Sequence, residues 1–247
     1  MMKKKSTGLG LVIPDKFRVG GLTFYKRNGQ VIGRVSDSDE KRSNTIRQFK
    51  QRQKMRHTTM LWKMLSFCNV MFTQRPTAYR NFASLANRLP EVYVDRHRMD
   101  QASFLMPGIP VSDGTLPAVH LELGEVDGVP ALLTDINPQE RLIREKLWLY
   151  TAEQTFENEF MPRVRFKMQE LSFPDITMVD GRIALVGEEY ADNMKGWALV
   201  RVTHDRCSPQ TIVTRCTYYQ QYTTEEALQA AAESYGGLTE RPFLSPR

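Results

Sequence analysis

The chain has 247 residues, of which 41% are apolar and 25% are charged, a composition typical of a globular protein. No stretch reaches the roughly 20 apolar residues that a membrane-spanning helix needs, and the apolar run near residue 10 is too short for a secretory signal. We therefore expect a cytoplasmic protein or a component of a larger particle. The three cysteines are too few for a disulfide framework, and we expect Cys207 and Cys216 to be reduced thiols.

The net charge of +6 hides an uneven distribution. Residues 1–100 carry 21 Lys and Arg against seven Asp and Glu, a net charge of +14. Residues 101–247 carry 13 against 21, a net charge of −8. A basic front of this kind indicates an anionic partner, which is nucleic acid, an acidic protein surface or the acidic part of a second copy.

The N-terminal region begins with a basic arm, which we expect to be flexible over residues 1–17. A β-hairpin is predicted over residues 18–36, where LTFYKR and QVIGRV flank Asn28-Gly29. This dipeptide accepts positive φ at both central positions of a two-residue turn. Gly20-Gly21 permits a tight bend at the base of the hairpin.

The longest predicted helix covers residues 41–67. Residues 36–39, with the sequence SDSD, supply capping oxygens and acidic side chains before it, and no Pro or Gly interrupts it. Apolar residues recur at helical spacing near its two ends, but Met55 is the only one between residues 50 and 59. We therefore expect the middle of the helix to face solvent or a partner.

Cations form two rows along this helix. The candidate binding residues are Arg47, Lys50 and Lys54 in one row and Arg52, Arg56 and Lys63 in the other. Two such rows suit a phosphate backbone, although charged runs of this kind are more often solvated or face another protein. The sequence contains no helix-turn-helix, zinc finger or RRM pattern, so any nucleic-acid contact is expected to be with phosphates.

A second helix is predicted over residues 76–89, with Pro76 in its first turn. Short β-type runs then follow, separated by Gly, Pro and the turn signals Asp113-Gly114, Asp127-Gly128 and Asp180-Gly181. The runs are EVYV, PAVHLEL, VPALLTDI, EKLWLYTAE, RVRFKMQEL, RIALVGEEY, GWALVRVT and TIVTRCTYYQQY. This pattern is typical of an antiparallel sandwich. Residues 151–162 are predicted to form a loop.

A C-terminal helix is predicted over residues 224–235, with Thr223 and Glu226 as a capping box and Gly236-Gly237 as the C-cap. The whole chain therefore predicts an α+β fold. Its predicted parts are a basic arm (1–17), a hairpin with two helices (18–90), a β-sandwich-like domain (91–222) and a C-terminal helix with its tail (223–247).

The sequence contains no Walker loop, GxGxxG, GxSxG, HExxH or CxxC motif, and it predicts no cofactor and no metal site. Asp95, His97 and Asp100 are the residues on which a metal-dependent hydrolase or nuclease would be built. Three polar residues in a linker are more simply a surface loop, so we do not expect an enzyme.

The residues Gly20, Gly21, Tyr25, Asn28, Gly29, Arg34, Thr45, Gln48 and Arg52 form a pattern over about residues 18–90. In it, a Gly-containing hairpin precedes a Thr-x-x-Gln-x-x-x-Arg helix. The pattern resembles an uncharacterised domain-of-unknown-function family of short bacterial proteins typical of gut anaerobes. This chain departs from that family in being longer and in its C-terminal helix. The resemblance implies a recognition or assembly role and no catalytic residue.

Three functional hypotheses result. The first is a non-enzymatic binding or assembly module whose basic hairpin and helix contact an acidic partner or another copy. The second is a nucleic-acid-binding protein that contacts phosphates through the helix over residues 41–63. The third is the metal-dependent hydrolase.

Overall fold

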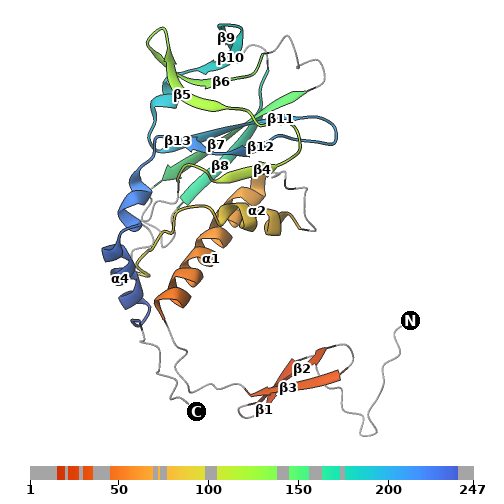
Figure 1. Ribbon diagram of the computed structural model, residues 1–247, viewed down its shortest axis with the longest axis vertical. Helices are drawn as coiled ribbons and strands as arrows, with labels where there is room; N and C mark the ends of the chain where they lie inside the picture. The colour runs from red at the N-terminus through yellow and green to blue at the C-terminus, as the bar shows by residue number, and fades with distance from the viewer. Residues whose placement is uncertain are drawn as a thin grey trace, which may run out of the picture. The chain divides into compact units, whose positions relative to one another are not determined.

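The computed structural model describes residues 16–19, 22–27, 30–35, 45–68, 72, 77–97, 105–137, 145–155, 163–172 and 176–238. The chain divides into two compact units, residues 1–43 and residues 44–247. Helices and antiparallel sheets occur together, and a helix lies near the C-terminus, which confirms the predicted α+β class (Figure 1). None of the helices in the described ranges is long and apolar enough to span a membrane.

The first unit contains a three-stranded antiparallel sheet in the order β1-β2-β3. Its strands are β1 (Lys16–Val19), β2 (Leu22–Arg27) and β3 (Gln30–Val35). Arg27 lies opposite Gln30, so β2 and β3 form the predicted hairpin with a two-residue connection. β1 starts inside the range predicted as a flexible arm, and its Phe17 lies opposite Phe24.

The helices of the second unit are α1 (Ile46–Leu65), the 3-10 helix η1 (Ser66–Cys68), α2 (Ala78–Ala86) and α4 (Glu225–Ser234). The helix predicted over residues 41–67 is α1. It begins at Ile46 because Thr45 caps it: the Thr45 hydroxyl accepts from the Gln48 backbone N–H, and the Gln48 side chain accepts from the Thr45 N–H. The acidic segment 36–39 lies outside the described residues.

The two shorter helices also have threonine caps. Thr77 caps α2 by accepting from the Arg80 backbone N–H, and Pro76 lies outside the described residues. For α4 the predicted cap was off by one residue, because Thr224 accepts from Ala227 N–H at 3.1 Å. Thr223 instead donates to the carbonyl of Gln220 in the 3-10 helix η5 (Tyr218–Tyr222).

The C-cap of α4 is confirmed. Gly236 and Gly237 have φ of 96° and 80°, the left-handed region that glycine enters without steric cost.

Two four-stranded antiparallel sheets form the β-rich part. The outer sheet has the order β5-β6-β10-β9, with β5 (Leu121–Val126), β6 (Val129–Thr134), β10 (Arg182–Val186) and β9 (Thr177–Val179). The middle sheet has the order β13-β11-β7-β8, with β13 (Val213–Thr214), β11 (Lys195–Val202), β7 (Lys146–Thr155) and β8 (Arg163–Glu170). A separate pair joins β4 (Pro110–Asp113) to β12 (Pro209–Thr211), and the 3-10 helix η4 (Glu188–Ala191) follows β10.

The middle sheet is buried on both faces. In β11, Trp197 and Leu199 belong to the apolar core shared with the outer sheet. Ala198 and Val200 belong to a second core, shared with α1, η1 and α2. The second unit therefore has three layers, in which the middle sheet separates the outer sheet from the helices (Figure 1).

The β-run predictions were wrong at four places. The EEY end of RIALVGEEY forms η4. EVYV forms no strand, and its Tyr93 N–H donates to the Tyr222 carbonyl at 2.8 Å. The YYQQY end of the last run forms η5. β7 continues to Thr155, into the range predicted as a loop.

The Asp-Gly turn signals have two outcomes. Asp127-Gly128 and Asp180-Gly181 have positive φ and connect hairpins, as predicted. Gly114 instead lies where a Cβ atom would be 1.8 Å from the carbonyl oxygen of Cys207, so glycine is required there by close packing.

Two further buried features hold the middle sheet in place. Arg201 of β11 makes two hydrogen bonds, of 2.7 and 2.8 Å, to the carboxylate of Glu145.

All three cysteines are buried free thiols, and Cys68 donates to the Phe166 carbonyl of β8. Burial raises the pKa of Cys68 and of Cys207.

Candidate functional site

α1, which carries the predicted cations, has one buried and one exposed face. Its buried residues are Phe49, Gln53, His57, Thr58, Leu61 and Leu65. The expectation that the middle of the helix faces solvent or a partner is therefore wrong for Gln53, His57 and Thr58. Hydropathy could not indicate this burial, because these side chains are polar and their neighbours come from distant parts of the chain.

The first half of α1 is covered by α4 and by the segment that holds Tyr93. Phe49 packs in a cluster with Tyr93, Leu228, Ala231 and Ala232. The two alanines let α4 approach closely. Burial also lowers the pKa of His57, in the middle of α1, to about 4, so this imidazole is neutral at pH 7.

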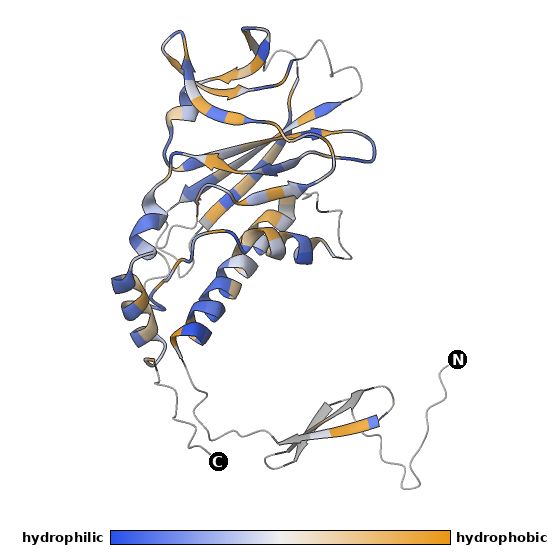
Figure 2. Ribbon diagram, viewed as in Figure 1, coloured by the Kyte–Doolittle hydropathy of each residue, from blue (hydrophilic) through white to orange (hydrophobic). Residues whose placement is uncertain are grey.

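The opposite face of α1 is open. Its exposed residues are Ile46, Arg47, Gln48, Gln51, Arg52, Met55 and Lys63. Met55, on this face, has 56% of its surface exposed. Within the described ranges, no carboxylate lies at ion-pair distance from Arg47, Lys54 or Lys63. Figure 2 shows the hydrophilic character of the N-terminal half of α1. We call this surface the cationic face.

Two of the six predicted cations lie at the margins of α1 and contact aromatic rings. The Lys50 ammonium lies 5.8 Å from the centre of the Tyr93 ring, and the Arg56 guanidinium lies 5.4 Å from that of Tyr235. Burial, and then the charge of Arg96, lower the pKa of Arg56. These two cations help to hold α1 against its neighbours, whereas Arg47, Arg52 and Lys63 point outward.

The predicted hairpin residues belong to the first unit. Tyr25 lies opposite Ile32 in β3, and Arg34 lies opposite Thr23 in β2. Gly20, Gly21, Asn28 and Gly29 lie outside the described residues. A surface that combines the hairpin with the helix therefore stays a prediction.

The residues of the hydrolase hypothesis form a local turn. The carboxylate of Asp95 accepts a hydrogen bond of 2.7 Å from the backbone N–H of His97, and Asp100 lies outside the described residues. Across the part of the chain that the structure describes, no group of three or more His, Cys, Asp or Glu side chains is placed to hold a metal ion.

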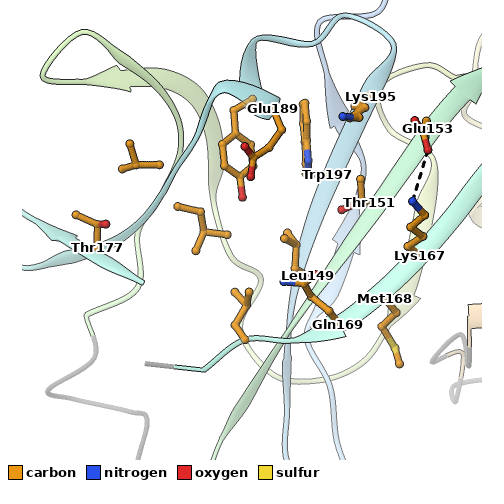
Figure 3. A pocket seen from close by; sticks show the side chains of 14 residues that line it. Leu149, Thr151, Glu153, Lys167, Met168, Gln169, Thr177, Glu189, Lys195 and Trp197 are labelled. Carbon is orange, nitrogen blue, oxygen red and sulfur yellow. Dashed lines mark ion pairs between the residues drawn. The ribbon is translucent and has the colours of Figure 1, made fainter. Parts of the chain in front are cut away.

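A cleft of about 770 Å³ lies between the outer and middle sheets, and the sequence did not indicate it (Figure 3). Tyr190 and Trp197 pack together in its wall, with ring centres 5.1 Å apart. Burial, and then the charge of Glu189, raise the pKa of Tyr190, so its hydroxyl stays protonated at neutral pH.

Each of the two lysines that line this cleft lies near a carboxylate. Lys167 lies 3.7 Å from the Glu153 carboxylate, and Lys195 lies 3.3 Å from Asp192. The residues that line the cleft include no Ser, Cys or His that could act as an activated nucleophile or its base. The polar lining of the cleft suits a neutral polar or zwitterionic molecule.

A smaller groove of about 420 Å³ lies on the outer sheet, over β6 and β10. Leu133 and Ala184 contribute apolar side chains to it. Gly124 of β5 makes room for Leu133, since a Cβ atom at Gly124 would lie 2.8 Å from the Leu133 side chain. The polar residues that line the groove are His120, Glu122, Thr134, Asp135, Asp180 and Arg182. We call it the acidic groove.

Comparisons with known proteins find no family model that matches the sequence, and no curated protein or solved structure that is significantly similar to it. Function is therefore argued from surface chemistry alone.

Proposed function

We propose that the chain is a non-enzymatic binding module whose cationic face contacts an acidic protein surface. The observation that carries the proposal is the lack of nearby carboxylates around three cations of α1. Arg47 and Lys63 on the exposed face, and the half-buried Lys54, have no carboxylate at ion-pair distance in the described ranges, although the opposite face of the same helix is packed. Unpaired cations on a rigid helix can contact an anionic partner without first breaking an internal ion pair.

The exposed Met55 favours a protein as that partner. Protein interfaces combine a central apolar contact with a charged and polar rim, and methionine is enriched in them. Met55 lies between the two cation rows of the helix, with Arg52 and Lys54 nearby in sequence. A partner with an apolar spot surrounded by carboxylates would match this layout.

Nucleic acid is the second candidate, and the placement of the two cation rows on different sides of α1 favours it. An α-helix with its side chains is about 10–12 Å across, and the major groove of B-DNA is about 12 Å wide. Cations on both margins of such a helix reach the phosphates of both strands. Gln48 and Gln51, exposed on α1, would then face the base edges.

The test measures binding of the full chain to poly-L-glutamate and to mixed-sequence DNA and RNA at about 50 and about 200 mM salt. The helix-neutral variant carries Arg47→Gln, Arg52→Gln, Lys54→Gln and Lys63→Gln. Its matched control removes four exposed cations elsewhere, through Arg165→Gln, Lys167→Gln, Arg206→Gln and Arg215→Gln. Both variants change the net charge by the same amount.

We expect poly-L-glutamate to bind, and the helix-neutral variant to weaken that binding about tenfold more than the control does. Equal losses in both variants would show that net charge alone attracts the polymer, and the proposal would fail. Tighter binding to duplex DNA than to poly-L-glutamate, with the same dependence on α1, would replace it with the second candidate.

A further inference from the structure

The charges of the second unit are separated by layer. Residues 45–68, 72 and 77–97, which we call the helix layer, contain nine Lys and Arg against two Asp and Glu, a net charge of +7. Residues 117–137 and 176–192, which hold the outer sheet and η4, contain one Arg against eight Asp and Glu, a net charge of −7. α4 packs on α1 and adds Glu225, Glu226 and Glu233, which lowers the net charge of the helices to +4. The helices and the outer sheet therefore carry opposite charges.

These two layers lie on opposite faces of the middle sheet (Figure 1). The helix layer packs on one face through Leu61, Leu65 and Phe82, and the outer sheet packs on the other through Leu132 and Ile183. Their attraction for one another is weak within one molecule, since the distance across a packed sheet exceeds the Debye length of about 8 Å at physiological salt. The cations on the open face of α1 and the carboxylates of Glu122, Asp135 and Asp180 are exposed, so both charged surfaces are accessible to other molecules.

The acidic groove is chemically complementary to the cationic face. Leu133 and Val179, both half-buried, provide apolar contact, and the carboxylates of Glu122, Asp135 and Asp180 line the same groove. Arg182 is the one Lys or Arg among its lining residues. Met55 with its neighbouring cations on one copy and this groove on another are thus complementary in both polarity and charge.

We propose that copies of this chain associate head to tail, with the cationic face of one copy seated on the acidic groove of the next. This inference rests on the proposed function and names its partner as a second copy. The two surfaces differ, so each contact leaves a free cationic face at one end and a free groove at the other. Contacts of this heterologous type give closed rings or open chains, and not a closed symmetric dimer.

The nearest opposing charges do not block this contact. α4 carries Glu225, Glu226 and Glu233, but it packs on the Phe49 side of α1, away from the exposed face. Attraction between the two surfaces is expected to weaken steeply as salt rises, because the ion pairs at their rims are solvent-exposed.

The experiment measures the average mass of the full chain by light scattering over a series of protein concentrations, at about 50 and about 200 mM salt. We expect the average mass to rise with concentration at low salt and to return towards that of the monomer at high salt. A chain that stays monomeric at every concentration at low salt would overturn the inference.

Two variants test the two surfaces separately. The helix-neutral variant removes the cationic face, and a groove-neutral variant carries Glu122→Gln, Asp135→Asn and Asp180→Asn. Each alone should weaken self-association about tenfold to a hundredfold. A control with Glu170→Gln, Asp205→Asn and Glu233→Gln removes three exposed carboxylates elsewhere and should associate like the unmodified chain. Circular dichroism and thermal unfolding verify that all variants are folded.

A mixture of the two variants tests directly whether the contact joins two different surfaces. The groove-neutral variant keeps a cationic face and the helix-neutral variant keeps a groove, so an equal mixture should form heterodimers that cannot grow. A symmetric contact through α1 alone would give self-association of the groove-neutral variant and no heterodimer, which overturns the inference.

The binding test with poly-L-glutamate separates this inference from the proposed function. Binding through α1 by a chain that never self-associates would leave the proposed function standing and remove the head-to-tail contact. Self-association that the helix-neutral variant leaves unchanged would remove the head-to-tail contact as well. If poly-L-glutamate binding is also unchanged in that variant, the proposed function fails too.

Discussion

The two halves of α1 are buried by different kinds of neighbour. In the second half, Leu61 and Leu65 are fully buried in the core shared with the middle sheet and α2, and Trp62 packs edge-on against Phe72. In the first half, Phe49 is the one large apolar side chain that is buried. The next buried residues along the helix are the polar residues Gln53, His57 and Thr58.

This difference shows that a helix can be buried without a continuous apolar stripe. The second half is held by the apolar core of the three layers, and the first half by one phenylalanine cluster with α4 and two cation–aromatic contacts. The first half should therefore be the less stable one and the more sensitive to pH. Four measurements test this comparison, and they are ordered by expected effect.

Leu65→Ala removes a side chain with no exposed surface from the second half. The lost burial and the remaining cavity should lower the free energy of unfolding by about 3–5 kcal/mol. Urea unfolding followed by circular dichroism measures this change. Met55→Ala, on the exposed face, is the control and should change stability by less than about 0.5 kcal/mol. A loss below about 1 kcal/mol for Leu65→Ala would contradict the packing of this half.

Acid should destabilise the middle of α1, next to its first half, through His57. Its pKa is about 4 when folded and about 6.5 when unfolded, so between these values the unfolded chain binds a proton that the folded chain excludes. Stability is therefore complete above about pH 6.5 and is lost as pH falls to 4, by about 3 kcal/mol.

Unfolding free energies of the unmodified chain and of His57→Gln, compared at pH 7, 5.5 and 4, isolate this contribution. The variant keeps the remaining titrating groups. The unfolding free energy of the unmodified chain, minus that of the variant, should therefore fall by about 3 kcal/mol between pH 7 and pH 4. A difference that is the same at all three pH values would contradict the burial of a neutral imidazole.

Leu228→Ala should loosen α4 from the first half of α1, because Leu228 is fully buried in the cluster with Phe49. We expect a loss of about 2–3 kcal/mol. Hydrogen exchange should accelerate more at amides of residues 49–57 than at those of residues 61–65. Leu238→Ala, at an exposed leucine after α4, is the control. Equal acceleration in both halves would mean that α1 unfolds only as a whole.

Thr45→Ala should have the smallest effect, because it removes one side of a capping box at the solvent-exposed start of α1. A loss of about 1 kcal/mol is expected, and Thr45→Ser should restore most of it. Thermal unfolding measures both variants. No difference between serine and alanine would contradict the cap.

Local patterns in the sequence were sufficient for much of the fold. The hairpin register of β2 and β3, the turns at Asp127-Gly128 and Asp180-Gly181 and the Gly236-Gly237 cap each depend on neighbouring residues, and all could be predicted. Thr45 and Gln48 are adjacent on the first turn of α1 and form its capping box. The same two residues also belong to the pattern that resembles the bacterial family.

Long-range packing could not be predicted in the same way. EVYV has the composition of a strand, but Tyr93 bonds to Tyr222 and packs with Phe49 and α4, so tertiary contacts decided its conformation. The acidic groove joins residues near 120–135 with residues near 180, and no local pattern connects them. The sequence was sufficient to predict which cations lie on α1. It could not predict which of them contact aromatic rings, because those contacts depend on Tyr93 and Tyr235.

The covering of α1 by α4 also bears on how the chain acquires its structure during translation. Phe49 and Leu228 are separated by about 180 residues, which a ribosome adds in roughly 10–40 s. Until then the nascent chain lacks α4, so the inner side of the first half of α1 has only the segment of Tyr93 to pack against. We expect chaperones that recognise exposed hydrophobic segments to engage this region, and to be released once the final helix has left the exit tunnel.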